Sequence, residues 1–118
     1  MSQQIGFAAE KQAREYLSRQ GMRWITSNYR CRWGEVDLVM SDGELLVFVE
    51  VRSRVSAAYG NALESITYSK QKKIMRTATH YMATKKLYNT HSCRFDVVSI
   101  QGEQAQIDWV KNAFGMGF

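Results

Sequence analysis

Four charged side chains stand at alternate positions in two apolar segments that follow one another along the chain. Glu35 and Asp37 lie in the first segment, and Glu50 and Arg52 lie in the second. Carboxylate oxygens are the ligands that Mg²⁺ and Mn²⁺ prefer, and Mg²⁺ commonly takes one or two protein carboxylates together with waters and a phosphate. If the two segments are paired strands, this spacing predicts a divalent-metal site centred on Asp37 and Glu50.

The four residues between these segments, Ser41-Asp42-Gly43-Glu44, indicate how the two strands pair. An Asp-Gly dipeptide flanked by apolar residues is the strongest short signal for a two-residue hairpin loop of type I′. With Asp42 and Gly43 in the loop, Ser41 faces Glu44. The register of the whole hairpin follows from that pair.

In this register the acids project from one face, because side chains alternate across a strand and positions two apart share a side. Glu35 lies opposite Glu50, at about 5 Å between Cβ atoms, and Asp37 lies opposite Phe48, on the diagonal at roughly 7 Å from Glu50. Like charges placed so close destabilise a sheet unless something compensates them. A bound cation compensates them directly.

A purely structural arrangement also accounts for these acids. Glu50 then pairs with Arg52 or Arg54, and Glu35 is exposed at the end of a strand. The pattern of residue types leaves both arrangements open.

The elements that must position the acids follow from the periodicity of the apolar residues. Apolar positions at helical spacing predict helices over 3–19, which is followed by Gly21, and over 67–86. Segments rich in β-branched and aromatic residues predict strands over 24–32, 35–40, 45–54, 94–100 and 104–110, and residues 113–118 are expected to form a loose tail. This order predicts an α/β or α+β fold in which helices pack on a mostly antiparallel sheet.

Two further charged residues fall near the face that the acids share. Glu10 lies beside Leu17 at the edge of the apolar stripe of the first helix, so it either reaches over the sheet or points into water. Lys70 lies four residues before Ile74, on the inward side of the second helix, where a lysine needs an anion or an aqueous cleft. Lys70 is therefore either a site residue or a side chain that extends to the surface.

The composition is that of one folded domain. The chain has 118 residues, of which 45% are hydrophobic and 23% are charged, and these values argue against a disordered protein. The first residues lack the pattern of a secretory signal, and no stretch is long and apolar enough to suggest a membrane span. We therefore expect a single domain over residues 1–118 in a cytoplasmic protein.

The net charge of +5 is concentrated in the middle of the chain. Residues 52–86 contain eight basic side chains and one acidic side chain. A basic surface beside an acidic cluster suits a polyanion whose phosphates are attracted and then brought to a cation. Lys72, Lys73 and Arg76 fall on the outer side of the second helix, where they are either phosphate contacts or an ordinary solvated face.

Five motifs along the chain resemble the YraN-like family of bacterial proteins. They are Gly6-Phe7-Ala8-Ala9-Glu10, Gly34-Glu35-Val36-Asp37-Leu38, Phe48-Val49-Glu50-Val51-Arg52-Ser53-Arg54, Ser69-Lys70-Gln71-Lys72 and Cys93-Arg94-Phe95-Asp96-Val97-Val98. That family is regarded as similar to archaeal Holliday junction resolvases within the PD-(D/E)xK, or restriction-endonuclease-like, nuclease superfamily. The resemblance implies an αβββαβ core, which agrees with the order of elements predicted above.

Carried over by position, the resemblance implies a metal-dependent nuclease site. Asp37 and Glu50 correspond to the acids that bind Mg²⁺ or Mn²⁺, and Glu10 corresponds to the first-helix glutamate of the resolvase-like branch. The superfamily lysine, two residues after the second acid, is replaced here by Arg52. An arginine stays protonated, so it can hold a phosphate or stabilise charge on phosphorus but cannot accept a proton from water. Proton transfer would then need Lys70.

Three functions are consistent with these observations. The first is a metal-dependent endonuclease for structured or branched nucleic acid, with DNA as the expected substrate and a homodimer implied by the resolvase-like relatives. The second is a catalytically inactive nucleic-acid-binding module, and the third is a scaffold whose acidic face binds a partner. Candidate catalytic residues are Glu10, Glu35, Asp37, Glu50, Arg52 and Lys70, and candidate nucleic-acid contacts are Arg54, Lys72, Lys73 and Arg76.

Overall fold

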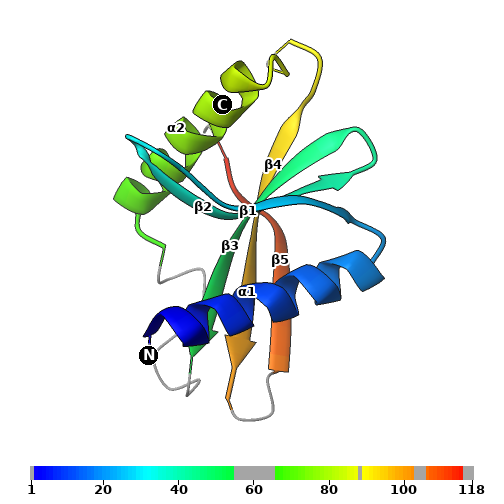
Figure 1. Ribbon diagram of the computed structural model, residues 1–118, viewed down its shortest axis with the longest axis vertical. Helices are drawn as coiled ribbons and strands as arrows, with labels where there is room; N and C mark the ends of the chain where they lie inside the picture. The colour runs from blue at the N-terminus through cyan, green and yellow to red at the C-terminus, as the bar shows by residue number, and fades with distance from the viewer. Residues whose placement is uncertain (1, 55–65, 88, 103–105, 116–118) are drawn as a thin grey trace.

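The computed structural model describes residues 2–54, 66–87, 89–102 and 106–115. They form helix α1 (Ser2–Arg19), strands β1 (Arg23–Cys31), β2 (Gly34–Asp42) and β3 (Leu45–Arg54), helix α2 (Tyr68–Thr84), and strands β4 (Cys93–Gln101) and β5 (Gln106–Phe114). The five strands make one sheet in chain order, in which only the pair of β3 and β4 is parallel among the described strands (Figure 1). The predicted α+β class with a mostly antiparallel sheet is confirmed, and it is consistent with a restriction-endonuclease-like core.

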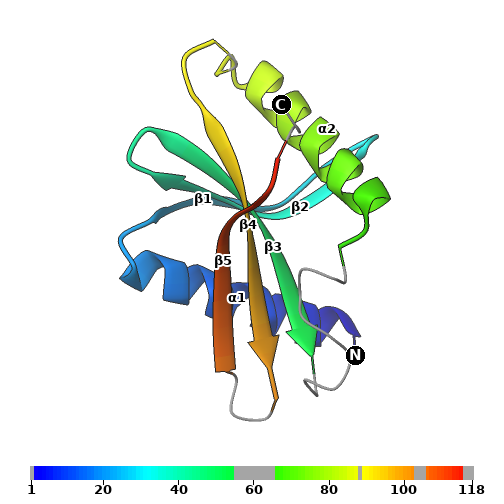
Figure 2. The same cartoon turned by 180° about the vertical axis from the view of Figure 1, so that it is seen from behind.

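The two helices pack on opposite faces of the sheet, as the two views show (Figure 1 and Figure 2). A parallel pair of strands needs a crossover connection, and α2 lies in the crossover between β3 and β4. Within the described ranges, no helix has the length and apolar character needed to cross a membrane. The buried faces agree with the predicted helical spacing: α1 contributes Ala9, Ala13 and Leu17 to one core, and α2 contributes Ile74, Ala78, Tyr81 and Met82 to the other.

The hairpin of β2 and β3 forms as expected, but its loop lies one residue later in the chain. Asp42 pairs with Leu45, so Gly43 and Glu44 form the loop, and the predicted pairing of Ser41 with Glu44 is wrong. Gly43 has a φ of 64°. A glycine at the first loop position is typical of type II′ hairpins, which the Asp-Gly signal does not distinguish from type I′ when the sequence is considered alone.

This correction changes which acids lie opposite one another. The pairing of β2 with β3 runs as far as Leu38, and the same register continued by one residue brings Asp37 opposite Glu50. The predicted pairs of Glu35 with Glu50 and of Asp37 with Phe48 are therefore wrong. Because the register differs by two positions, the shift alone would leave each side chain on its predicted face.

Strict alternation nevertheless fails at Asp37. Val36 packs in the core beneath α2, whereas Leu38 packs in the core beneath α1, although two such positions share one face of a regular strand. On β1, Asn28 lies across from this point, between the residues that pair with Leu38 and Val36, and it has a φ of 55°. Asparagine is one of the few residue types that tolerate this left-handed conformation. The side chains on either side of Asp37 therefore face different cores.

The predicted loose tail begins too early. β5 continues to Phe114, which pairs with Phe95 across the sheet. The two rings stack with centroids 5.2 Å apart, and Ala113 packs beside them against the core beneath α2. The two phenylalanines are far apart in the sequence, so the short local pattern did not indicate this contact. The remainder of the predicted tail, 116–118, lies outside the described residues.

Candidate functional site

Asp37 and Glu50 meet where β2 diverges from β3. Asp37 is half-buried, and its Oδ2 accepts a hydrogen bond of 2.8 Å from the backbone N–H of Val51. The pairing of the two strands has ended at Leu38, so this carboxylate takes the place of a backbone carbonyl from β2. Glu50, the residue before Val51, is only 7% exposed. Two acidic groups therefore lie together at the point where the backbone ladder opens.

The nearest cation to Glu50 does not neutralise it fully. Nη2 of Arg52 lies 3.8 Å from Oε2 of Glu50, which is a loose ion pair without a hydrogen bond. Among the described residues, Oε1 of Glu50 and Nε of Arg52 are buried and have no hydrogen-bond partner. A buried polar atom without a partner is costly and rare in folded proteins. In the predicted structural alternative, Glu50 pairs with Arg52 or Arg54. The structure contains the pair with Arg52, but this pair leaves one oxygen of Glu50 without a partner within the described ranges.

Glu10 and Glu35 approach the same region from α1 and β2. With its amide nitrogen turned toward the acids, Asn28 donates to Oε2 of Glu10 at 2.7 Å and to Oε1 of Glu35 at 2.9 Å. Arg30 also donates to Oε2 of Glu35 at 3.1 Å, in a partly exposed pair. Asn28 therefore links two acids from different elements, and Glu10 reaches over the sheet as one of its two predicted placements required.

The pKa values of three of these acids lie above their ordinary values. Burial, with the nearby charge of Asp37, raises the pKa of Glu50 to about 8. Burial also raises the pKa of Asp37, although the hydrogen bond from Val51 opposes the increase. Burial and then the charge of Asp37 raise the pKa of Glu10 to about 7. The cluster therefore retains protons near neutral pH, and a cation bound among the carboxylates would displace them.

Asp37 and Glu50 form a pair of potential cation ligands and not a closed cage. Within the part of the chain that the structure describes, no three Asp, Glu, His or Cys side chains are grouped so that they could hold a metal ion. Mg²⁺ commonly binds through one or two protein carboxylates and keeps several waters. The unpartnered Oε1 of Glu50, together with the carboxylate of Asp37, fits that donor set.

The predicted basic residues lie on the outer surface. Lys70 is exposed on the first turn of α2, where its backbone N–H bonds to Oγ1 of the N-cap residue Thr67, so its side chain extends to the surface and does not face inward. Lys72, Lys73 and Arg76 are exposed on α2 as expected. The side chain of Arg54 lies outside the described residues.

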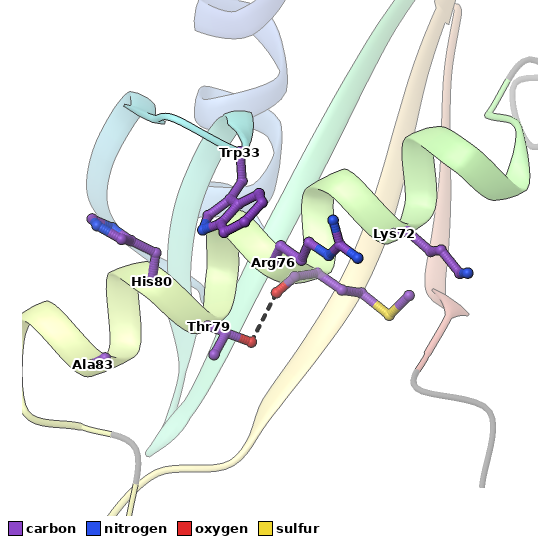
Figure 3. A pocket seen from close by; sticks show the side chains of 7 residues that line it. Trp33, Lys72, Arg76, Thr79, His80 and Ala83 are labelled. Carbon is purple, nitrogen blue, oxygen red and sulfur yellow. Dashed lines mark hydrogen bonds between the residues drawn. The ribbon is translucent and has the colours of Figure 1, made fainter.

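Sequence reasoning missed two residues. Asn28, which shapes and links the acidic cluster, could have been recognised because asparagine is depleted in strands. Trp33, in the turn between β1 and β2, is 39% exposed and lines a groove of about 440 Å³ with Arg76 and other residues of α2 (Figure 3). Its signal was an aromatic residue that directly follows Arg32 at a hairpin turn.

Comparison with known proteins assigns the family. The model of the uncharacterised protein family UPF0102 matches residues 9–100. A UPF0102 protein of Legionella pneumophila is 46% identical over 117 residues, which is 99% of each chain. A UPF0102 protein of Pseudomonas putida is 47% identical over 112 residues, 92% of this chain and 91% of that protein. One of Coxiella burnetii is 45% identical over 113 residues, 96% of this chain and 93% of that protein. The resemblance to the YraN-like proteins is confirmed, and the chain belongs to the UPF0102 family.

Proposed function

We propose that this protein is a Mg²⁺- or Mn²⁺-dependent endonuclease for structured or branched nucleic acid, with DNA as the expected substrate. The observation that carries the proposal is the buried Oε1 of Glu50, which has no hydrogen-bond partner among the described residues and lies beside the carboxylate of Asp37. Placing two like charges in a low-dielectric site is unfavourable unless a cation or a proton compensates them. A pair of carboxylates that a divalent cation would compensate suits phosphodiester chemistry.

The residues divide the work of hydrolysis as follows. Asp37 and Glu50 hold the cation, which when bound would lower the pKa of an attacking water and polarise the scissile phosphate. Glu10, with a pKa raised to about 7, is suited to exchange a proton at neutral pH. Asn28 holds Glu10 and Glu35 in place through its amide.

Arg52 supplies positive charge and does not transfer a proton. Its guanidinium lies beside Glu50, and its buried Nε has no hydrogen-bond partner among the described residues, so its positive charge is not fully used within the fold. Lys70, the other predicted partner for the water, is exposed on the first turn of α2. These positions support the electrostatic role for Arg52 over a general-base role for Lys70.

Calorimetric titration with Mn²⁺ tests the site without a substrate. We expect one binding event in the wild-type protein, and its loss in Asp37→Asn and in Glu50→Gln. Binding should strengthen between pH 6 and pH 8 because the raised pKa values of Glu50 and Asp37 make protons compete with the cation. Asp108→Asn, which changes an exposed acid on β5, is the matched control and should bind Mn²⁺ as the wild type does.

Cleavage of a labelled four-way DNA junction in Mg²⁺ tests the activity itself. Wild type and Asp108→Asn should cleave, and Asp37→Asn and Glu50→Gln should lose at least 100-fold, on the order expected when a catalytic metal is removed. Arg52→Ala should lose more activity than Arg52→Lys if Arg52 acts through its charge. Metal-dependent cleavage that persists unchanged in Asp37→Asn and Glu50→Gln would refute the assignment.

Arg52 also favours a second candidate, a nucleic-acid-binding module without turnover. A side chain that cannot accept a proton stands where the nuclease superfamily carries lysine, and it forms only a loose pair with Glu50. This candidate predicts salt-dependent binding that involves Lys72, Lys73 and Arg76. It also predicts no cleavage of single-stranded, duplex or branched nucleic acid in Mg²⁺ or Mn²⁺.

A further inference from the structure

An exposed indole is held at the tip of the β1–β2 hairpin, beside α2. Trp33 and Arg32 form the two-residue turn between the paired residues Cys31 and Gly34. In the groove of about 440 Å³, the side chain of Trp33 lies over the surface of α2, close to Arg76 (Figure 3). Both the turn and the helix are regular elements, so the indole has a defined position while 39% of its surface stays exposed.

Gly34 allows the turn to approach the helix closely. Its φ is 149°, and a Cβ atom at this position would lie 3.4 Å from Oγ1 of Thr77 and 3.7 Å from Cβ of Lys73. A residue with a side chain would therefore be disfavoured by its backbone conformation, while its Cβ would make only ordinary van der Waals contact with α2. The glycine directly after Trp33 therefore lies in contact distance of α2 at the base of the turn.

The charges around the indole suit a polyanion. The guanidinium carbon of Arg32 lies 4.7 Å from the ring centroid of Trp33, and that of Arg76 lies 5.2 Å from it. The described side chains that line the groove include the cations Lys72 and Arg76 and no acid. His80 also lines it, and its Nδ1 is 2.6 Å from the hydroxyl of Tyr29, which orients the ring. An apolar platform surrounded by cations is the arrangement by which proteins bind single-stranded nucleic acid.

We propose that Trp33 stacks on an unpaired nucleobase while Arg32, Arg76 and Lys72 contact the adjoining phosphates. A nucleobase stacks more strongly on an indole than an exposed guanidinium does, so either arginine can leave the ring and bind a phosphate. Glu35 follows Trp33 by two residues, so the same hairpin carries both the indole and one acid of the cluster. The inference deepens the proposed function, because it names unpaired bases as the part of the substrate that is recognised.

Fluorescence anisotropy with a labelled oligodeoxythymidine of about 20 nucleotides, at low salt and in EDTA, tests the stacking apart from cleavage. We expect Trp33→Ala to weaken binding about tenfold, within the range for loss of one stacked base. Trp33→Phe should restore part of the affinity. An oligonucleotide of equal length made of abasic sites keeps the phosphates, so wild type and Trp33→Ala should bind it with affinities that differ by less than about twofold.

Trp24 offers a matched control elsewhere on the molecule. It is also an exposed tryptophan, and the guanidinium carbon of Arg14 lies 4.5 Å from its ring centroid. Unlike the groove beside Trp33, the groove that Trp24 lines includes an acid, Glu44, so Trp24→Ala should bind the oligodeoxythymidine as tightly as wild type does. Circular dichroism melting of each variant confirms that the fold is retained.

Four results would overturn the inference. They are equal binding of the thymidine strand by wild type and Trp33→Ala, an equal loss on the abasic strand, an equal loss in Trp24→Ala, and no binding of the thymidine strand by wild type. The failure of the proposed endonuclease is separate. If the wild-type protein neither binds Mn²⁺ nor cleaves the junction, but still binds the oligodeoxythymidine through Trp33, the endonuclease alone is refuted. If it cleaves the junction but binds the oligodeoxythymidine equally well without Trp33, the stacking alone is refuted.

Discussion

Two buried acids in the same sheet are surrounded in opposite ways. Asp96 on β4 is fully buried, and its two carboxylate oxygens accept hydrogen bonds from Nε and Nη2 of Arg94 at 2.8 and 2.9 Å, from Nε1 of Trp109 at 3.0 Å and from the backbone N–H of Asn112 at 2.9 Å. Glu50 on the neighbouring β3 is 7% exposed, and its Oε1 has no hydrogen-bond partner among the described residues. The two carboxylates are buried to a similar extent, but they differ in the number of hydrogen-bond donors around them.

The difference separates structure from candidate function. A buried carboxylate that accepts four donors and pairs with an arginine has all of its charge compensated within the fold. A buried carboxylate with one oxygen that no donor reaches, beside a second acid, costs stability unless a ligand arrives. Asp96 therefore belongs to the framework of β4 and β5, whereas Glu50, whose Oε1 has no hydrogen-bond partner among the described residues, is the better candidate for binding a ligand.

The largest expected effect follows from removing the charge of Asp96. Asp96→Asn leaves the guanidinium of Arg94, whose side chain is 15% exposed, without its buried partner. Removing one partner of a buried ion pair lowers the free energy of unfolding by about 3–5 kcal/mol. Urea denaturation at pH 7 should therefore show a fall of this size in the free energy of unfolding. Asp108→Asn, an exposed acid on β5, should change it by less than about 0.5 kcal/mol. A loss below about 1 kcal/mol for Asp96→Asn would remove the contrast.

Removing the charge of Glu50 is expected to change the free energy of unfolding in the opposite direction. In EDTA, its raised pKa of about 8 means that the folded protein binds a proton that the unfolded chain, with a value near 4.5, has released. The free energy of unfolding should therefore decrease as pH rises from about 5 to above 8. Glu50→Gln removes this loss, and one pKa unit corresponds to about 1.4 kcal/mol, so the variant should exceed wild type by on the order of 2–4 kcal/mol at pH 8.5.

The same urea titrations at pH 4.5 provide the control for Glu50→Gln. Both proteins then carry an uncharged group at position 50 in the folded state, so their stabilities should nearly coincide. Glu50→Gln that is less stable than wild type at pH 8.5 would show that Glu50 is satisfied as Asp96 is, and the contrast between the two acids would fail.

The pairing of acids shows how far local sequence patterns reach. Alternation and the Asp-Gly signal predicted the hairpin and brought Asp37 and Glu50 to neighbouring positions, because both depend on residues close in sequence. The predicted position of the loop was wrong by one residue, since Gly43 can occupy either of the two loop positions and the dipeptide alone does not select one.

Features that depend on distant contacts were not predictable. The break in alternation at Asp37 arises where Asn28 adopts a left-handed φ on the neighbouring strand. The stacking of Phe114 on Phe95 joins β5 to the core beneath α2. The helical spacing placed Lys70 on the inward side of the helix. Lys70 lies on the first turn, however, where its side chain is exposed beyond the packed core. Each outcome is decided by which elements meet in space.

Asn28 supports the open site in two ways that substitution can separate, and its effect should be the smallest. Asn28→Ala removes the amide that joins Glu10 to Glu35. It also places an alanine at a φ of 55°, a left-handed conformation that costs alanine about 1–2 kcal/mol. Asn28→Gly removes the amide but keeps the conformation, so its loss of unfolding free energy should be smaller. Urea denaturation measures these losses, and Mn²⁺ titration measures what each does to the acids. If the break at Asn28 positions Asp37, then Asn28→Gly retains Mn²⁺ binding and Asn28→Ala weakens it, whereas equal weakening in both variants would assign the effect to the amide bridge and not to the backbone.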